Sequence, residues 1–377
     1  MDPSMDLPFT EDQRHIRTAA AELLTARRMT AGARAVREEP EGHSAALWKE
    51  MTELGWPALA LPEEHGGLGA GVIGLCLLCE ELGRHQIPSP LLPTVACAAL
   101  PLARHGSAEL CAEWLGAVAE GRTLTYARAA PHGRWGTAGS TLRATPSGRE
   151  GFRLDGTALF VPYAETADAI LVMAQTGDHT ELTALLVEAA TPGLRRHRLE
   201  VVGNTPEYRV DFTGAVVPAA RVVGAVGGGG AVAEMAAALG TVATCAEMAG
   251  GAQGVLDMTV TYAKTREQFG RPIGSFQAIQ QHCADMAVDV LGARVSAYEA
   301  AWRLTRGLPA ALEVSQAKAW GSEGYERVCA LAHQVHGAIG FTAEHDLPFF
   351  TRHATASALA FGDADHHTGR VAEALGL

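Results

Sequence analysis

The pattern of hydrophobic and polar positions changes twice along the chain. Apolar residues first recur at helical spacing, then fall into short β-like runs, and return to long helical stretches after the glycines at 227–230. At 377 residues with 47% hydrophobic content, the chain has enough apolar material for several packed units. The pattern predicts an α+β multidomain protein with three parts: an N-terminal helical domain at 1–120, a β domain at 121–228 and a C-terminal helical bundle at 229–377.

The first part contains clear helix start and stop signals. Thr10 and Gln13 have the spacing of a capping box, and Ser44 is placed to cap a helix that runs to Leu54. An apolar stretch at 72–82 is followed by Gly83, which favours a helix end there. Further helices are expected at 96–102 and 108–119.

The middle part is rich in short strand signals, namely TLTYARA, GFRLDGTALFVP, ADAILVMAQT, LTALLVEA and RVDFTGAVVP. Only a few Gly, Pro, Asp or Asn residues separate these runs, which favours an antiparallel barrel or sandwich over a parallel sheet with crossover helices. The glycines at 227–230 are then expected to be a flexible joint.

Long helical patterns fill the rest of the chain. They are expected at 231–264, 276–306 and 310–335, with a last helix from about Phe349 onward. Four such helices can pack as a four-helix bundle.

Charge and targeting signals narrow the function classes. A net charge of −12 and a pI near 5.7 argue against general binding to nucleic acid or an anionic membrane, so an anionic ligand needs local arginines such as Arg266 and Arg271. The sequence shows neither a signal peptide nor an uninterrupted apolar run of membrane length, which predicts a cytoplasmic protein. The seven cysteines are expected to be reduced packing residues.

The segment YAKTREQFGRPIGSFQAIQ, from Tyr262 to Gln280, carries the strongest chemical signal. It places the Arg266 guanidinium and a glycine-bearing turn at a helix end, with Ser275 in position to cap the next helix, and such a loop suits a diphosphate. Together with PEEHGGLG, ADM and QVHGAIGFTAEHDL, this segment closely resembles the acyl-CoA dehydrogenase family of flavoproteins.

The resemblance implies a cofactor, FAD, and the residues that hold it. In that family the same turn reaches across a subunit interface to the diphosphate of a partner's FAD, and the C-terminal bundles build the oligomer core. In the β domain, the family's flavin loop and Trp-Ile-Thr strand are replaced by YARAAPHGRWGTAGS and FVPYA, which leaves Phe160 to cover the flavin ring. The implied cofactor-binding residues are Arg266, Gln268, Phe269, Gln277, Gln334, Gly337, Ala338 and Phe160.

Dehydrogenation of an acyl thioester needs a carboxylate base in a water-poor pocket. Many relatives place a glutamate in a YEGT motif, but the matching sequence here is FGDADHH, and Gly362 occupies the glutamate's position. Glu247 is the preferred base, because Gly250 and Gly251 leave its helix face free of bulk and no Lys or Arg lies within one turn. The alternative is that these glycines serve tight helix packing.

Two other acids, Asp363 and Asp365, lie close to the usual base and are the second choice, although either can simply cap a helix. His366 and His367 are weaker candidates, and they lack the spacing of a metal site. Glu344, His345 and Asp346 are better explained as an acidic helix start than as a catalytic triad.

The leading hypothesis is an FAD-dependent enzyme that oxidises the Cα–Cβ bond of an acyl thioester, acyl-CoA or acyl-carrier protein, to a 2-enoyl thioester. The resemblance implies an electron-transfer flavoprotein as electron acceptor and a homo-oligomer or a homologous partner subunit. Two alternatives stay open: a non-catalytic or half-site subunit of a heteromeric dehydrogenase, and a redox-neutral thioester-modifying enzyme of specialised biosynthesis.

Overall fold

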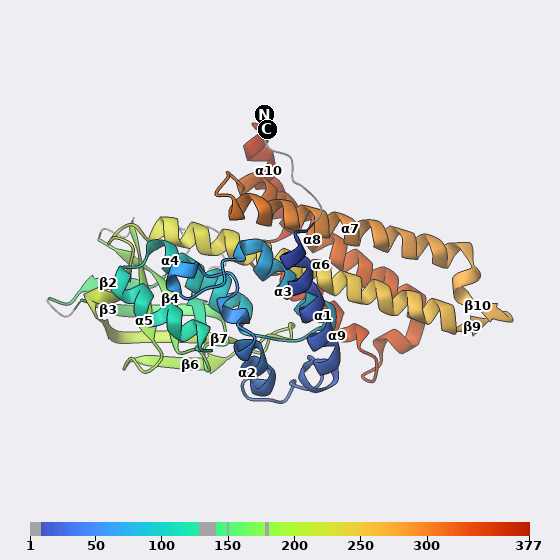
Figure 1. Cartoon of the computed structure of the whole chain (residues 1–377), viewed down its shortest axis with the longest axis horizontal. Helices are drawn as coiled ribbons and strands as arrows, with labels where there is room; N and C mark the ends of the chain where they lie inside the picture. The colour runs from blue at the N-terminus through green and yellow to red at the C-terminus, as the bar shows by residue number, and fades with distance from the viewer. Residues whose placement is uncertain (1–8, 128–140, 149–150, 178–180) are drawn as a thin grey trace.

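The computed structural model describes residues 9–127, 141–148, 151–177 and 181–377. The sheet and the last helices of the N-terminal part occupy one end of the elongated molecule, and the first helices lie near its middle. Long helices run from the sheet end to a small hairpin at the other end (Figure 1). Connections near residues 120 and 228 separate the three groups of elements.

Short helices and turns make up the N-terminal part. Their caps agree with the sequence signals: Thr10 and Gln13 form the expected capping box, and the Ser44 hydroxyl accepts a hydrogen bond from the Leu47 backbone N–H. The elements are α1 (Glu11–Ala31), α2 (Ala45–Glu53), η1 (Trp56–Ala58), η2 (Glu63–His65), α3 (Gly71–His85), η3 (Pro93–Ala99), α4 (Leu100–His105) and α5 (Ala108–Ala119).

Two helix predictions in this part were wrong. Helix α3 continues past Gly83 to His85, because Gly83 is a close-approach residue: a side chain there would overlap the backbone of Glu247 on α6. The expected helix at 96–102 is split between the π-helical turn η3 and α4.

The middle part forms an eight-stranded sheet in the order β6-β7-β3-β2-β4-β5-β8, with β1 paired to β4. Neighbouring strands are mostly antiparallel, but β1 and β4 are parallel, as is the single pairing of Arg143 on β2 with Gln175 on β4. The sequence runs did not reveal β2, β6 and β8. The strands are β1 (Leu124–Ala127), β2 (Arg143–Pro146), β3 (Phe152–Pro162), β4 (Ala169–Thr176), β5 (Glu181–Glu188), β6 (Leu194–Arg198), β7 (Glu207–Val217) and β8 (Val222–Val223).

Both faces of the central strands are covered. On β4, Leu171 and Met173 join the hydrophobic core that the helices form, whereas Ile170 and Val172 join a second core on the other face of the sheet. The two sets alternate, as side chains along a strand must. This double burial explains why β4 and β5 are almost uninterruptedly apolar in sequence.

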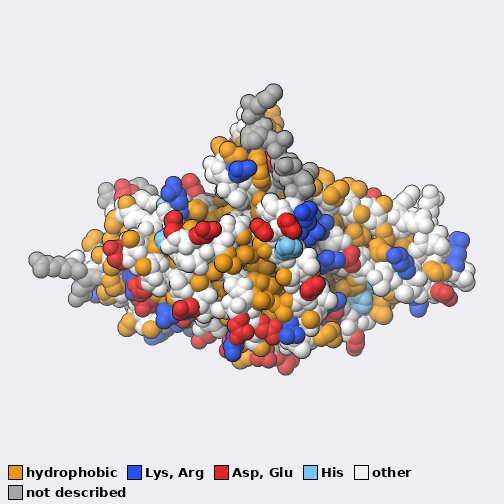
Figure 2. Space-filling model, in the orientation of Figure 1, with side chains coloured by type: hydrophobic (Ala, Val, Ile, Leu, Met, Phe, Trp, Pro, Cys, Tyr) orange, Lys and Arg blue, Asp and Glu red, His pale blue; other side chains and the backbone are white. Residues whose placement is uncertain are grey.

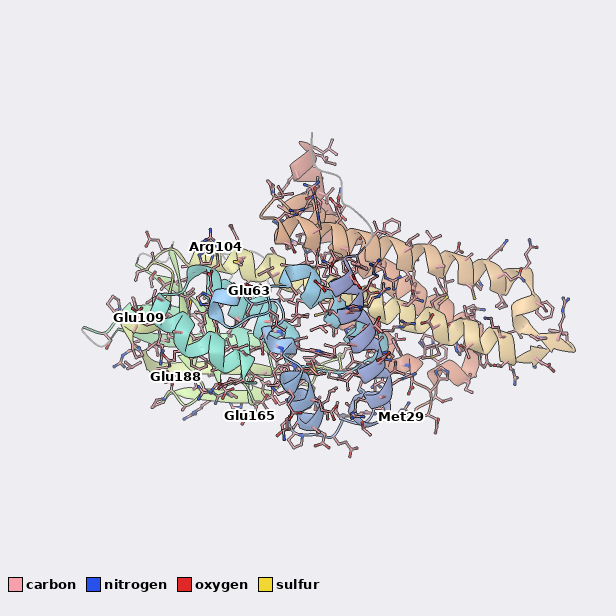
Figure 3. The ribbon with its side chains drawn as sticks, in the orientation of Figure 1. Met29, Glu63, Arg104, Glu109, Glu165 and Glu188 are labelled. Atoms are coloured by element: carbon pink, nitrogen blue, oxygen red, sulfur yellow. The ribbon has the colours of Figure 1, made fainter. Side chains whose placement is uncertain are left out.

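An exposed ion-pair group also joins the sheet to the N-terminal helices. The Arg221 guanidinium, in the turn η5 (Ala219–Arg221), lies 2.5 Å from a carboxylate oxygen of Glu113 on α5 and 2.6 Å from one of Glu188 at the end of β5. Figure 3 shows Glu188 beside α5 on this side of the molecule. Because these groups are partly solvated, the ion pairs contribute little to stability, and they mainly orient η5 relative to α5 and the end of β5.

The C-terminal part is a bundle built around the longest helix, α6, which packs against α3, α7, α8 and α9. The elements are α6 (Gly229–Thr265), β9 (Glu267–Gln268), β10 (Arg271–Pro272), η6 (Ile273–Ser275), α7 (Gln277–Thr305), α8 (Ala311–His336), η7 (Gly337–Phe341), α9 (Leu347–Leu359) and α10 (Ala364–Leu375). Helix α6 is long and apolar enough to cross a membrane, but two thirds of its most apolar window are buried in the molecule, so it is a core helix of the fold.

The structure corrects four expectations for this part. The glycines at 227–230 are not a free joint: the Gly227 N–H donates to Thr183 on β5, and Gly229 already belongs to α6 and packs against the backbone of β5. The last helix is two helices, α9 and α10. Ser275 does not cap α7, since its hydroxyl donates to the Pro272 carbonyl. Helix α9 has no acidic first turn; Asp346 instead pairs with Arg28 and Arg34.

The face shown in Figure 2 has hydrophobic side chains gathered in its middle, between the β domain and α1, with acidic and basic side chains interspersed around them. Within the described residues the six cysteines other than Cys283 are buried, and none of the seven is in a disulfide. They therefore act as packing residues, as their apolar context predicted.

Candidate active site

Glu247 is a half-buried carboxylate on α6 in otherwise buried surroundings. Its side chain is 27% exposed, and its Oε1 lies 3.6 Å from Nε2 of His353 on α9. Cys79 on α3, Tyr163 directly after β3 and Tyr325 on α8 are close enough that the Glu247 charge adds to the pKa increase that burial causes in each of them. Side chains from three helices and the β domain thus converge on this carboxylate.

The glycines beside Glu247 have a packing role. A side chain at Gly250 would overlap the Glu80 carbonyl oxygen on α3, and one at Gly251 would overlap the Tyr325 hydroxyl on α8. The alternative explanation from the sequence, tight helix packing, therefore accounts for both glycines. Glu247 is therefore distinguished by the side chains around it and not by an open helix face.

The position where many relatives carry the base is closed. Gly362 is buried with φ +115°, and a Cβ there would lie 2.6 Å from a ring carbon of His366 and 2.9 Å from Nε2 of His367. The Lys318 ammonium, fully buried on α8, donates at 2.9 Å to the carbonyls of Ala358 and Gly362 and so fixes this turn.

The neighbouring candidates have structural roles. Asp363 caps α10, because its carboxylate accepts a 2.8 Å hydrogen bond from the His366 backbone N–H, and Asp365 is exposed. Burial lowers the pKa of His367 to about 4, so this imidazole is neutral near neutral pH. Both Asp363 and Asp365 remain candidates by position alone.

A Gly362→Glu substitution should therefore not provide a working base. We expect it to lower the free energy of unfolding by about 2 to 4 kcal/mol, because it adds a side chain at positive φ and against two imidazoles. Chemical denaturation measures the loss. A stable Gly362→Glu variant that restores turnover to a Glu247→Gln protein would show that the turn can open.

Glu207 is a second acid near the end of β3 that the sequence patterns did not single out. Its residue pairs with Pro162 across the β3–β7 ladder, and burial raises the pKa of its carboxyl group to about 7. Glu207 is therefore the other carboxylate that has to be tested as the general base.

The predicted cofactor loop forms the exposed tip of the bundle. Arg266 ends α6, and within the described part of the chain its guanidinium forms no ion pair. Gln268 lies on the β9–β10 hairpin, and Phe269, at its turn, has φ +54° and a side chain that is 91% exposed. Gln277, the first residue of α7, is also exposed. An arginine without an ion pair to the described residues and an exposed aromatic ring on one short loop suit an anionic, aromatic ligand supplied from outside.

The second predicted segment lies beside the first. Gln334, Gly337 and Ala338 line a cavity of about 620 Å³ between α8, η7 and α9. The rings of Tyr262 on α6 and His336 on α8 stack at 4.5 Å, which connects this cavity to the helix end that carries Arg266. Gly337 has φ +62° and open space where a Cβ would stand, so the backbone is accessible, and the Ala338 methyl group fits without a clash because it faces the cavity.

Phe160 lies on the other side of the protein, in the β domain. It is 53% exposed, with φ +54°, in the irregular pairing of β3 with β7 between Ala158 and Val161. The segment YARAAPHGRWGTAGS that stands in place of the family's flavin loop falls mostly at 128–140, outside the described residues.

One chain does not bring the two halves of this cofactor site together. Tyr163, three residues after Phe160, is near Glu247, and Glu247 is nineteen residues before Arg266 on the continuous helix α6. At 1.5 Å per residue along the helix axis, Glu247 and Arg266 are about 28 Å apart.

The sequence patterns did not single out the side chains grouped around Glu247. They come from four separate segments with no common motif, and they are Gln86, Tyr163, Tyr325 and His353.

Comparisons with known proteins agree with this architecture. The model of the acyl-CoA dehydrogenase N-terminal domain matches residues 10–122, and that of the C-terminal domain matches residues 227–376. Acyl-CoA dehydrogenase FadE27 of Mycobacterium tuberculosis is 35% identical over 341 residues, 87% of each chain.

Solved structures extend the likeness to nearly the whole chain. One chain of the ChsE4-ChsE5 complex from Mycobacterium tuberculosis superposes with a TM-score of 0.88 at 33% identity and covers 99% of both chains. The FAD complex of PigA superposes with a TM-score of 0.87 at 25% identity and covers 99% of this chain and 100% of that one. The chain belongs to the acyl-CoA dehydrogenase family, and it is a flavin oxidoreductase with the fold of that family.

Proposed function

We propose that this protein oxidises the Cα–Cβ bond of an acyl thioester to the 2-enoyl thioester, with Glu247 as the general base. The observation that supports Glu247 most directly is its half-buried carboxylate, which faces Tyr163, Tyr325 and His353 at the junction of the bundle and the β domain. Within the described residues no Lys or Arg forms an ion pair with this carboxylate, and its nearest basic group is the His353 imidazole.

The chemistry requires two bonds to break together. The Glu247 carboxylate takes the proton from Cα, and the C–H electron pair forms the new Cα–Cβ double bond as hydride leaves Cβ. Bound FAD supplies the two-electron acceptor for that hydride. Buried neighbours such as Tyr163 and Tyr325 limit the access of water to the carboxylate.

The FAD diphosphate would be held by residues at the tip of the bundle. Arg266 would donate two hydrogen bonds to it, and Gln334, with the accessible backbone at Gly337 and Ala338, would line its other side. Gln268, Phe269 and Gln277 would contact the remainder of the dinucleotide, while Phe160 would cover the ring from the other subunit. The separation of about 28 Å within one chain supports sites shared between two copies.

We expect an Arg266→Ala substitution to weaken FAD binding about 10- to 100-fold, because a charge-assisted contact to the diphosphate is lost. Titration of the apoprotein with FAD, followed by flavin fluorescence, measures this. Lys264→Ala, which removes the same charge from the exposed last turn of α6, is the matched control and should change the affinity little. If both variants lose the same affinity for FAD, the effect comes from the general loss of positive charge, and a direct contact of Arg266 with the diphosphate is contradicted.

A second candidate is that this chain shares its flavin sites with a homologous partner rather than with its own copies. The incomplete site within one chain and the structural likeness to a member of the two-component ChsE4-ChsE5 complex favour it. Purified homomer with added FAD decides between them: flavin reduction by an acyl-CoA without a second protein rejects the heteromer. Nothing in the structure favours redox-neutral chemistry.

The remaining partners follow from the same proposal. The thioester carrier is coenzyme A or an acyl-carrier protein, and an electron-transfer flavoprotein reoxidises the reduced flavin. We place the protein in the cytoplasm, where these partners are found in soluble form.

A further inference from the structure

Three polar side chains form a closed cluster behind Glu247. They are Gln86, directly after α3, Tyr325 on α8 and His353 on α9. Gln86 and Tyr325 are buried, and the His353 side chain is 12% exposed. Nε2 of Gln86 lies 3.4 Å from the Tyr325 hydroxyl and 3.3 Å from Nδ1 of His353, and the hydroxyl lies 3.3 Å from the same Nδ1.

The hydrogen-bond pattern fixes which way the Gln86 amide points. Its Nε2 donates to the Gly83 carbonyl at 2.8 Å, and its Oε1 accepts from Nδ2 of Asn204 at 3.2 Å. Asn204 is fixed in turn, because its Nδ2 also donates to the Phe349 carbonyl at 3.0 Å. Rotating the Gln86 amide would place its oxygen against the Gly83 carbonyl oxygen and its NH₂ against the Asn204 NH₂.

This orientation determines the proton on His353. A Gln86 N–H can only donate, either to Nδ1 of His353 or to the Tyr325 oxygen, and in the second case the Tyr325 O–H donates to Nδ1. In both arrangements Nδ1 is an acceptor. A hydrogen on Nδ1 could donate only to the Tyr325 oxygen, and it would leave the buried Tyr325 O–H without an acceptor among the described residues. A neutral imidazole with an acceptor at Nδ1 carries its hydrogen on Nε2, and Nε2 is the atom that faces Glu247 Oε1 at 3.6 Å.

We infer that His353 is a positioning residue for the base: its Nε2–H, fixed by Gln86 and Tyr325, orients the Glu247 carboxylate and stabilises its charged form. This inference rests on the proposed role of Glu247. At 3.6 Å the contact is longer than a hydrogen bond, and contacts of this kind commonly shorten when substrate closes the site.

The backbone at Gln86 shows how strongly the cluster is held. Gln86 has φ +49°, in the left-handed region that a residue with a side chain rarely adopts, and its amide makes contacts with α8, α9 and the segment before β7. Glycine would be the ordinary residue at such a helix end. The hydrogen bonds of the buried Gln86 amide therefore offset the strain of its backbone.

Few groups other than His353 can titrate beside Glu247. The groups that face it are Cys79 from α3, Tyr163 from the β domain, Tyr325 from α8 and His353 from α9. Burial raises the pKa of Cys79, Tyr163 and Tyr325, so all three stay neutral through the acidic and neutral range. These three groups therefore do not contribute to the acidic limb of a pH–rate profile.

The first experiment reads the tautomer directly and needs no substrate. In the FAD-loaded protein with ¹⁵N-labelled histidine, the resonances missing from a His353→Gln sample identify His353. Above neutral pH we expect an Nδ1 shift typical of an acceptor and an Nε2 shift typical of a protonated nitrogen. A hydrogen on Nδ1 would overturn the inference.

The second experiment measures kcat/KM against pH with the saturated acyl-CoA, chosen from short, medium and long chains, that reduces the wild-type flavin fastest. We expect His353→Leu to lower kcat about tenfold and to move the acidic limb up by about one pH unit, since loss of the donor destabilises the carboxylate. His353→Gln, which can again present an N–H, should recover most of both. His197→Leu is the matched control, because His197 lies 3.6 Å from Asp211 on the exposed part of the β domain.

The outcomes separate the inference from the function on which it rests. If Glu247→Gln is inactive but His353→Leu keeps the wild-type limb and kcat, the positioning role is wrong and the base stands. If Glu247→Gln keeps full turnover, the proposed base is wrong whatever His353 does. An equal shift in His197→Leu would also overturn the inference, because the effect would then be general.

Discussion

Glu247→Gln should reduce the rate of flavin reduction by an acyl-CoA at least about 1,000-fold, because the amide keeps the shape of the side chain but cannot accept the α-proton. FAD content and thermal stability should stay near wild type, since Glu247 is half-buried and forms no ion pair with a Lys or Arg of the described residues. Anaerobic stopped-flow spectroscopy of the flavin absorbance measures the rate.

Three substitutions serve as controls for that result. Glu207→Gln tests the partly buried carboxylate near the β3 end, Asp365→Asn tests an exposed acid beside the usual base position, and Asp363→Asn keeps a helix-capping side chain. Each should stay within a few-fold of the wild-type rate. Full activity of Glu247→Gln combined with loss in any one of these would move the base to that residue.

Gly250→Ala should strongly destabilise the protein. The new methyl group would overlap the Glu80 carbonyl oxygen, and because that oxygen belongs to the backbone of α3, a whole helix has to shift. We expect a loss of about 3 kcal/mol in the free energy of unfolding. Because bound FAD also stabilises the folded state, denaturation is compared at equal protein and FAD concentrations.

Gly116→Ala is the matched control for that substitution. Gly116 lies on an exposed face of α5 with nothing near the place of a new Cβ, so alanine there should stabilise the helix by about 0.5 to 1 kcal/mol. If the free energy of unfolding falls for Gly250→Ala and rises for Gly116→Ala, the close approach of α3, and not helix propensity, explains the need for glycine at position 250. An unchanged midpoint for Gly250→Ala would contradict the packing of α3 on α6.

Local patterns in the sequence were sufficient where the physics is local. The capping box at Thr10, the cap at Ser44 and the bounds of α5 depend on residues within one turn, and the structure reproduces them. The order of helical, β and helical parts was also readable, because it follows from the period of the apolar positions.

Patterns failed where a distant segment determines the local conformation. Gly83 was read as a helix end, but it allows the Glu247 backbone to approach α3, and Gly250 was read as open space beside a base, although α3 fills that space. In both cases the partner residue is more than a hundred positions away, so no local signal records it.

The sequence by itself determined the class of protein: the basic, glycine-bearing loop around Arg266 and the three-part pattern lie in contiguous segments, and the family resemblance rests on them. Only the tertiary structure brought His353, Tyr325, Gln86 and Tyr163 around Glu247, and closed the turn at Gly362 with the buried Lys318. Helix packing decides such neighbours, because a side chain's surroundings depend on which helix faces meet and not on spacing along the chain.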